Sequence, residues 1–130
     1  MTAFSDFLEN ELLDGTLRGP GNAYTPVATV YVGLHTSATN DDDTGAEVAT
    51  GSYARTSSAF DAPSAGSTSN SATITFPTAT ASWGTVTHFG IYDASVAGNL
   101  LYWGALTISK TVDNGDIFTF PAGNLTVSLD

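Results

Sequence analysis

The sequence predicts an all-β protein: an antiparallel, jelly-roll-like β-sandwich that carries a short amphipathic helix at its N-terminus. Short apolar runs recur along the chain, and turn-forming Gly, Asn, Asp or Pro close most of them, which is typical of strands. Only the first residues show a helical period. At 130 residues the chain fits one core. We expect an N-terminal helix and linker over residues 1–19 and a sandwich domain over residues 20–130.

The N-terminal segment has the apolar spacing of a helix over residues 2–14. Its apolar stripe consists of Phe4, Phe7, Leu8, Leu12 and Leu13. Gly15 stands where a C-terminal cap belongs, and the Gly/Pro-rich segment LRGPGNAYTP that follows is a linker. So short a helix is marginal alone in water, so its stripe must pack on something. The sandwich of the same chain, a neighbouring copy and a partner protein are all candidates, and the linker favours the last two.

The strands follow in short runs. The first covers residues 27–34, with the more apolar face (Ala28, Val30, Val32 and Leu34) pointing inward. A long polar loop separates it from the others, which are expected at 52–60, 72–76, 86–93, 99–108, 116–120 and 124–129. The segments 97–99 and 113–116 have the composition of hairpin turns, and the second contains the Asn-Gly pair that suits a type I′ turn.

Composition narrows the range of functions. The formal net charge is −10, and the three basic residues are scattered along the chain, so neither nucleic acid nor an anionic membrane is an expected partner. The chain has no Cys, which removes disulfides, thiolate metal sites and a Cys nucleophile. The N-terminus lacks the pattern of a signal peptide, so we expect synthesis in a cytoplasm.

Three candidate sites can be weighed against structural roles. The acidic cluster Asn40–Glu47 offers oxygen ligands but lacks EF-hand spacing, so a solvated loop is favoured over a metal site. His88 and Asp93 could belong to a Ser-His-Asp triad, but the chain has no G-x-S-x-G motif. Seven Tyr and Trp residues could stack on sugars, although such residues more often fill a core or a subunit interface. We therefore predict no enzyme, no cofactor and no metal.

Several segments resemble a family of small tailed-bacteriophage virion proteins that are described as tail-fibre, head-fibre or capsid decoration (cement) proteins. The likeness runs nearly end to end, through FSDFLENELLDG, YTPVATVYVGLHT, GAEVATGSYAR, FPTATASWGTVTHFGIYDA and the residues that follow them. The SYAR and WGTVTHFGIYDA segments are its more specific parts. The resemblance implies a β-sandwich that trimerises on the outer face of the capsid and binds the major capsid protein, with no catalytic residues to transfer.

These observations predict a capsid decoration protein that stabilises the shell from the outer capsid surface of the virion. Repetition of weak contacts over many copies would supply avidity. The expected partner- or oligomer-binding residues are Phe4, Phe7, Leu8, Leu12, Leu13, Tyr31, Trp83, Tyr102 and Trp103. The alternative is a tail-fibre or head-fibre adhesin that binds host-surface glycans. Head or tail location, the surface that meets the capsid and the role of the acidic loop stay open.

Overall fold

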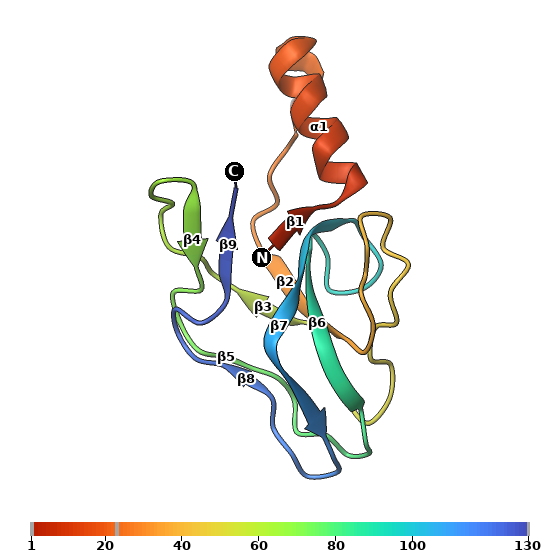
Figure 1. The fold of residues 1–130 in the computed structure, drawn as a ribbon. Helices are drawn as coiled ribbons and strands as arrows, with labels where there is room; N and C mark the ends of the chain where they lie inside the picture. Colours follow the sequence, from red (N-terminus) through yellow and green to blue (C-terminus); the bar gives the residue numbers. More distant parts are fainter. Residues whose placement is uncertain (1, 23, 130) are drawn as a thin grey trace.

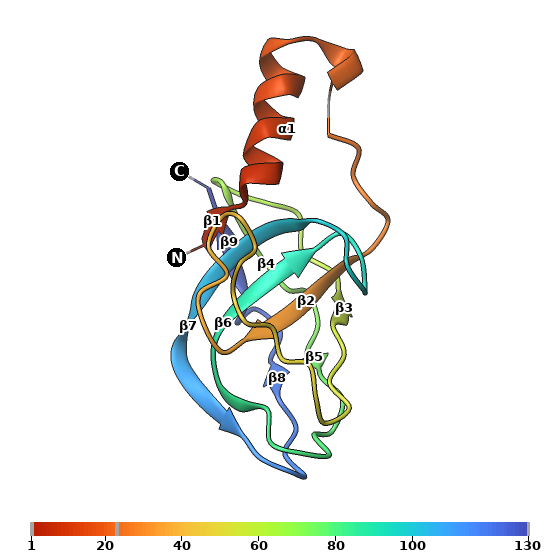
Figure 2. The same cartoon turned by 90° about the vertical axis from the view of Figure 1, so that its right-hand side faces the viewer.

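The fold is built around a five-stranded antiparallel sheet with the order β1-β7-β6-β2-β3 (Figures 1 and 2). The computed structural model describes residues 2–22 and 24–129. In sheet order the strands are β1 (Thr2–Phe4), β7 (Leu100–Val112), β6 (Gly84–Tyr92), β2 (Val30–His35) and β3 (Thr56–Ser58).

Two short antiparallel ribbons form the second layer, to the left of β6 and β7 in Figure 1. They pair β4 (Ser67–Ser69) with β9 (Thr126–Ser128) and β5 (Ile74–Thr75) with β8 (Thr119–Phe120). Buried side chains of both layers belong to one apolar cluster; Leu34 and Val86 come from the sheet, Phe76 and Phe120 from the ribbon side. Burial of this shared apolar surface holds the layers together. The predicted all-β antiparallel sandwich with a short N-terminal helix is confirmed.

The N-terminus differs from the prediction of a helix over residues 2–14. Thr2–Phe4 form β1, which pairs with Tyr102–Gly104 of β7, and the helix α1 covers Asp6–Leu17. The ring of Phe4 lies 5.4 Å from that of Tyr102. Tertiary pairing therefore overrides the local helical period in the first turn.

The end of α1 also differs. Gly15 lies inside the helix, and Arg18 is its C-cap. Gly19 follows with a φ of 104°, a value that L side chains rarely adopt, and the short 3₁₀ helix η1 (Pro20–Asn22) comes next. The helix stops at the glycine that takes the left-handed conformation, four residues beyond the predicted one.

The sheet contains one expected hairpin and lacks another. Residues 97–99 lie in the turn that joins the paired strands β6 and β7, as predicted. Residues 113–116 also form a turn, but β7 pairs with β1 and β6, whereas β8 pairs with β5. This turn carries the chain from one layer to the other, so the hairpin prediction there was wrong. The strand β4 lies in a Ser-rich stretch where none was predicted.

The first strand was placed almost correctly. It runs from Val30 to His35, and the side chains of Val32 and Leu34 are fully buried, as expected for the inward face. His35 is fully buried as well, although it belongs to the opposite face of the strand. Both faces of β2 are therefore covered, and a second set of contacts must account for the burial of His35.

Candidate assembly surface

α1 is attached firmly at its first residues. Ser5 is the N-cap: its Oγ accepts a hydrogen bond of 3.2 Å from the amide of Leu8 and donates one to the carbonyl of Leu100. The amide of Ser5 donates to the carbonyl of Leu101 (3.0 Å), and that of Asp6 donates to the carbonyl of Asp41 (2.9 Å). These bonds set the direction in which the helix leaves the sheet.

The rest of α1 projects away from the sandwich, as Figures 1 and 2 both show. Leu8 is buried, but Leu12 is 38% exposed, Leu13 56% and Leu17 76%. Phe7 packs edge-on against Tyr24, with ring centroids 6.3 Å apart. An amphipathic helix is normally stabilised by covering its apolar face, so the outer half of α1 presents an apolar surface that the described part of its own chain leaves exposed.

α1 is also acidic. It carries Asp6, Glu9, Glu11 and Asp14, and the guanidinium of Arg18 lies 3.0 Å from the carboxylate of Asp14. Both partners of this ion pair are exposed, so it contributes little to stability. The projecting helix is therefore an arm with leucines and carboxylates on its surface.

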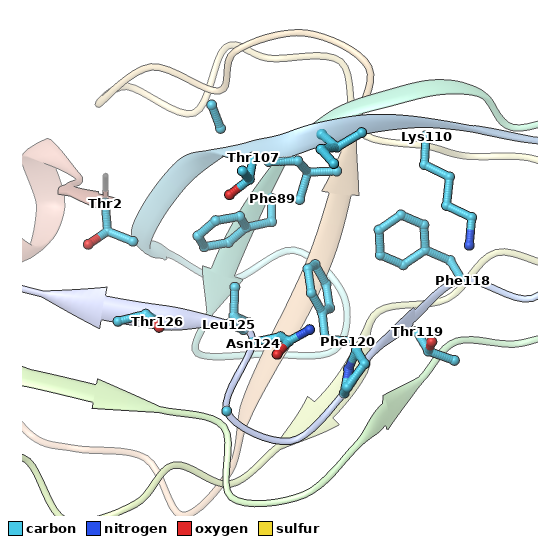
Figure 3. Close-up of a pocket in the computed structure, with 15 residues that line it drawn as sticks. Thr2, Phe89, Thr107, Lys110, Phe118, Thr119, Phe120, Asn124, Leu125 and Thr126 are labelled. Carbon is cyan, nitrogen blue, oxygen red and sulfur yellow. The ribbon is translucent and has the colours of Figure 1, made fainter.

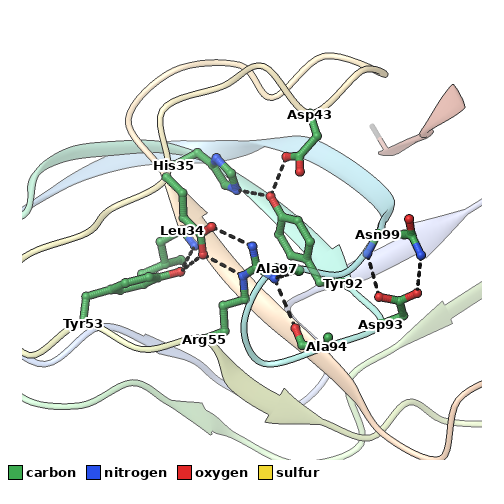
Figure 4. A network of polar contacts seen from close by, with 11 residues as sticks. Leu34, His35, Asp43, Tyr53, Arg55, Tyr92, Asp93, Ala94, Ala97 and Asn99 are labelled. Atoms are coloured by element: carbon green, nitrogen blue, oxygen red, sulfur yellow. Dashed lines mark hydrogen bonds and ion pairs between the residues drawn. The ribbon is translucent and has the colours of Figure 1, made fainter. Parts of the chain in front are cut away.

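A largely buried polar network lies beside β2, between the loop of residues 36–55 and the loop of residues 93–99 (Figure 4). Arg55 donates two hydrogen bonds of 2.8 Å to the two carboxylate oxygens of Glu47. The hydroxyl of Tyr53 donates to the same carboxylate at 2.8 Å and accepts a bond of 2.9 Å from the amide of Leu34. Burial alone would raise the pKa of Glu47, but the hydrogen bonds from Arg55 and Tyr53 outweigh it and lower that pKa.

Arg55 connects this network to a second loop. Its guanidinium lies 3.4 Å from the centre of the Tyr92 ring and donates to the carbonyls of Ala94 (3.1 Å) and Ala97 (2.7 Å). The hydroxyl of Tyr92 donates to a carboxylate oxygen of Asp43 at 2.7 Å and lies 3.0 Å from Nε2 of His35. Burial, followed by the bond to Asp43, raises the pKa of Tyr92. The network thus holds the 36–55 and 93–99 loops against β2.

His35 is neutral in this environment. Because the hydroxyl of Tyr92 donates its single hydrogen to Asp43, it can only accept from Nε2 of His35, which places the imidazole hydrogen on Nε2; Nδ1 is buried with no partner among the described residues. Burial lowers the pKa of His35 to about 4, an effect larger than the opposing influence of the Glu47 and Asp43 carboxylates.

The SYAR segment, noted as specific from sequence, supplies Tyr53 and Arg55 to this network. Sequence reasoning did not identify the network or its partners. The available signal was the scarcity of basic residues: with only three in the chain, an Arg inside a predicted strand is a candidate for internal pairing.

The acidic loop is tied to the fold by its carboxylates. Glu47 pairs with Arg55, Asp43 accepts from Tyr92, and Asp41 accepts a bond of 2.8 Å from the indole nitrogen of Trp103. Within the described ranges, no group of three His, Asp or Glu side chains is placed to hold a metal ion. This arrangement assigns a structural role to much of the loop.

The nine predicted contact residues fall into two groups by burial. Leu8 and Trp83 are buried within the chain, and the indole nitrogen of Trp83 donates to the carbonyl of Gly51 at 3.0 Å. The remaining seven are half-buried or exposed: Phe4, Phe7, Leu12, Leu13, Tyr31, Tyr102 and Trp103. For these seven, contact with a partner stays a prediction.

The two histidines and the aromatic residues show no catalytic arrangement in the part of the chain that is described. Nδ1 of His88 lies 2.8 Å from the hydroxyl of Thr87, and Asp93 accepts bonds from Asn99. Tyr53, Tyr92 and Trp83 belong to the network and the core. These contacts give His88 and Asp93 separate partners, and they place three of the seven Tyr and Trp residues inside the fold.

A cavity of about 580 Å³ lies between the second half of β7 and the segment from β8 to β9 (Figure 3). Phe89, Phe118 and Phe120 line it, and the ammonium of Lys110 lies 5.5 Å from the centre of the Phe118 ring. The described residues around it include no Asp, Glu or His. Its described lining therefore holds no paired carboxylates of the kind that glycoside hydrolysis uses.

A second hollow, the Tyr102 cleft, opens near β9 and the start of β2. It consists of adjoining cavities of about 460 and 210 Å³ that share Thr68, Tyr102 and Val127. Apolar side chains dominate its lining: Val30, Phe60, Pro63, Ile91, Leu101 and Leu129 also contribute.

No described helix is long and apolar enough to cross a membrane.

Comparison with known families provides a match over almost the whole chain. The family model described as "Podophage GP4 fiber I protein gp80" matches residues 3–128. A comparison with curated proteins found no match. The matched range includes α1, the polar network and the sandwich.

Proposed function

The chain belongs to the Podophage GP4 fiber I protein gp80 family of phage virion structural proteins, and we propose from this membership that it is a non-enzymatic surface subunit assembled through α1. The observation that carries this proposal is the projecting helix. Leu13 and Leu17 are largely exposed at the end of a helix whose first turn is fixed by hydrogen bonds. A pre-positioned apolar arm reduces the entropy lost on assembly, which favours use as an attachment element.

Our leading location is the outer capsid surface, where the chain would act as a decoration protein. In this proposal copies form homotrimers, bind the major capsid protein and stabilise the shell. Closed rotational symmetry limits each oligomer to a finite size, and repetition over the shell multiplies weak contacts. The acidic, Cys-free chain suits this role because net charge keeps a protein soluble at high local density.

A second location is a virion fibre. The family description names a fibre protein, and this specific observation favours it. A fibre subunit would use the same helix to assemble but would be confined to the fibre attachment points. Glycan recognition would then fall to the Tyr and Trp side chains that stay half-exposed, Tyr24, Tyr31, Tyr102 and Trp103.

Labelling of intact virions separates these locations. Gold-labelled antibody against the sandwich should mark the whole head if the chain decorates the capsid, and the tail or discrete attachment points if it builds a fibre. Purified chain should also bind undecorated capsids and raise their heat resistance in the first case only. Absence of the chain from purified virions would overturn both.

Variants connect the location to α1. The Leu13→Ser/Leu17→Ser chain should fold but be lost from virions. The matched control, Val96→Ser/Ile108→Ser, changes two side chains that are 80% and 81% exposed outside α1 and should be incorporated normally. Equal incorporation of both variants would exclude α1 as the attachment element.

A further inference from the structure

The segment of residues 36–46, which follows β2, is held in place by polar bonds rather than by apolar packing. Within it only Thr39 is buried, and the hydroxyl of Thr39 makes no hydrogen bond to the described residues. Asn40 and Asp43 have positive φ values of 56° and 58°, a conformation less favourable for them than for Gly. Because few buried groups resist its opening, the 36–46 segment can open locally while the core stays folded.

Bonds to three elements hold the 36–46 segment closed. The hydroxyl of Tyr92 in β6 donates to the carboxylate of Asp43 at 2.7 Å, and the indole nitrogen of Trp103 in β7 donates to that of Asp41 at 2.8 Å. The carbonyl of Asp41 accepts the bond of 2.9 Å from the amide of Asp6, the first residue of α1. The segment therefore helps to fix the first turn of the projecting helix.

His35 lies at the base of this segment, as the last residue of β2 (Figure 4). Its side chain is fully buried; Nε2 donates to the hydroxyl of Tyr92 at 3.0 Å, and Nδ1 has no partner among the described residues. Protonation would place a positive charge and a second N–H at a position that offers no acceptor. A buried charge and an unpaired donor are both costly, and opening of the segment would remove both costs.

The other charged and titratable groups do not relieve this cost. They face His35 from each neighbouring element: Asp43 from the 36–46 segment, Glu47 just after it, Arg55 from the chain before β3, and His88 and Tyr92 from β6. Burial lowers the pKa of His35 to about 4 and outweighs the carboxylates of Glu47 and Asp43, which act in the opposite direction. Glu47 is already bound by Arg55, and Asp43 by Tyr92.

We propose that protonation of His35 opens the 36–46 segment and thereby frees the first turn of α1 from its bond to Asp41. Opening hydrates the charged ring and separates Asp43 from Tyr92. Ser5 keeps its own bonds to β7, so α1 stays attached and gains freedom of direction. This inference goes beyond the proposed function: it concerns the single chain and does not depend on where the chain lies in the virion.

The direction of the effect follows from linkage. In the closed form the pKa of His35 is about 4, and in the open form it returns to the ordinary value of 6.5. The open form therefore binds the proton more tightly, and acid shifts the equilibrium toward opening. From pH 7 to pH 5 the equilibrium constant for opening should rise about 20-fold. Below a pH of about 4 the ring is charged in both forms and the effect levels off.

Amide hydrogen exchange of the full wild-type chain tests the proposal. The amides to follow are those of Thr44 and Gly45, which donate to the carbonyl of Thr39, and that of Asp6. After correction for the intrinsic pH dependence of exchange, their protection should fall about 20-fold from pH 7 to pH 5. It should stay below that of the core amide of Phe76, which donates to the carbonyl of Phe118.

Three results would contradict the inference. Equal protection of the segment and of Phe76 would mean that the segment opens only when the whole chain unfolds. Unchanged protection between pH 7 and pH 5 would mean that acid does not open the segment. Loss of protection at Thr44 and Gly45 with none at Asp6 would overturn the link to α1.

A variant assigns the effect to His35. His35→Gln keeps an N–H donor at the end of its side chain but does not titrate, so the protection of the segment should no longer change between pH 7 and pH 5. The same pH dependence in this variant would exclude His35. If the variant does not fold, nuclear magnetic resonance titration of the wild-type ring decides: titration at the ordinary value of 6.5 instead of about 4 would overturn the inference.

A matched pair of variants tests the bond that holds the segment. Asp43→Asn tolerates the positive φ but offers Tyr92 a neutral acceptor, so opening at pH 7 should increase about fivefold. Asp42→Asn makes the same charge change one residue away, where the carboxylate accepts from the hydroxyl of Thr44, and should leave opening unchanged. Equal opening in the two variants would contradict the role of the bond between Tyr92 and Asp43.

Discussion

At the scale of single residues, Arg55 organises the loops around β2. It binds Glu47 through two hydrogen bonds, lies on the ring of Tyr92 and caps two carbonyls of the 93–99 loop. Gly33 and Gly90 stand opposite each other on β2 and β6, and a Cβ on Gly33 would lie 2.9 Å from Glu47 Oε1. Small residues at this point leave room for the network.

Loss of the Glu47 charge should destabilise the fold. In Glu47→Gln the guanidinium of Arg55, whose side chain is only 9% exposed, loses its counter-charge. We expect the free energy of unfolding to fall by about 2–3 kcal/mol, somewhat below the range for fully buried pairs because Glu47 is partly exposed. Urea denaturation measures it. Asp14→Asn breaks the exposed pair with Arg18 and should change stability by less than about 0.5 kcal/mol; equal effects would contradict the structural role of the network.

His35 should make stability depend on pH. Its folded pKa of about 4 lies below the ordinary value of 6.5, so the unfolded chain binds more protons between these values. The free energy of unfolding should therefore decrease as pH falls from 7 to 5, by about 2 kcal/mol from this group. Urea titrations at several pH values measure the slope. His35→Asn should reduce it, whereas the same slope in both chains would exclude His35 as its source.

At the scale of elements, α1 depends on its first turn. Ser5 provides the cap and two hydrogen bonds to β7, whereas the leucines of the outer half of the helix are exposed. The helix can therefore fray without unfolding the sandwich, because regions with few buried contacts open locally.

Removal of the cap should loosen α1 alone. Ser5→Ala is expected to cost about 1 kcal/mol of helix stability. Amide hydrogen exchange over Asp6–Leu17 should accelerate about fivefold, while protection in β6 stays unchanged. Thr16→Ala is the control within the same helix: its hydroxyl bonds back to the carbonyl of Leu12, a contact that contributes little. Uniform loss of protection across the sheet would show that α1 and the sandwich unfold as one unit.

At the scale of the whole molecule, acidic residues are unevenly distributed. The sequence has none over residues 62–92, 94–112 and 117–129, which supply β4 to β9. The charge is carried by α1, the 41–47 loop and a few turns. In the homotrimer that we propose, copies of net charge −10 would meet through surfaces that lack this charge.

Salt should therefore strengthen association between copies. Raising sodium chloride shortens the Debye length from about 30 Å at 0.01 M to about 3 Å at 1 M, which screens the repulsion between acidic chains. The average mass from light scattering should increase with salt at a fixed protein concentration. Dissociation at high salt would instead indicate that ion pairs between copies hold the oligomer.

The sequence by itself determined the fold class, most of the strands and the family. Period-two runs closed by turn residues report local geometry, which a single chain segment encodes. The inward face of β2 at Val32 and Leu34 followed from the same alternation. The family likeness pointed to a virion protein, and the family match agrees.

Only the tertiary structure decided which strands pair, and therefore which conformation Thr2–Phe4 adopt and which strands the 113–116 turn connects. Thr2–Phe4 became a strand because β7 offered an edge, and residues 113–116 join two layers because β8 pairs with β5. The partners of Arg55 come from segments up to 42 residues away. Such contacts depend on how distant segments meet in the folded chain, and local patterns of charge or hydropathy do not encode that meeting.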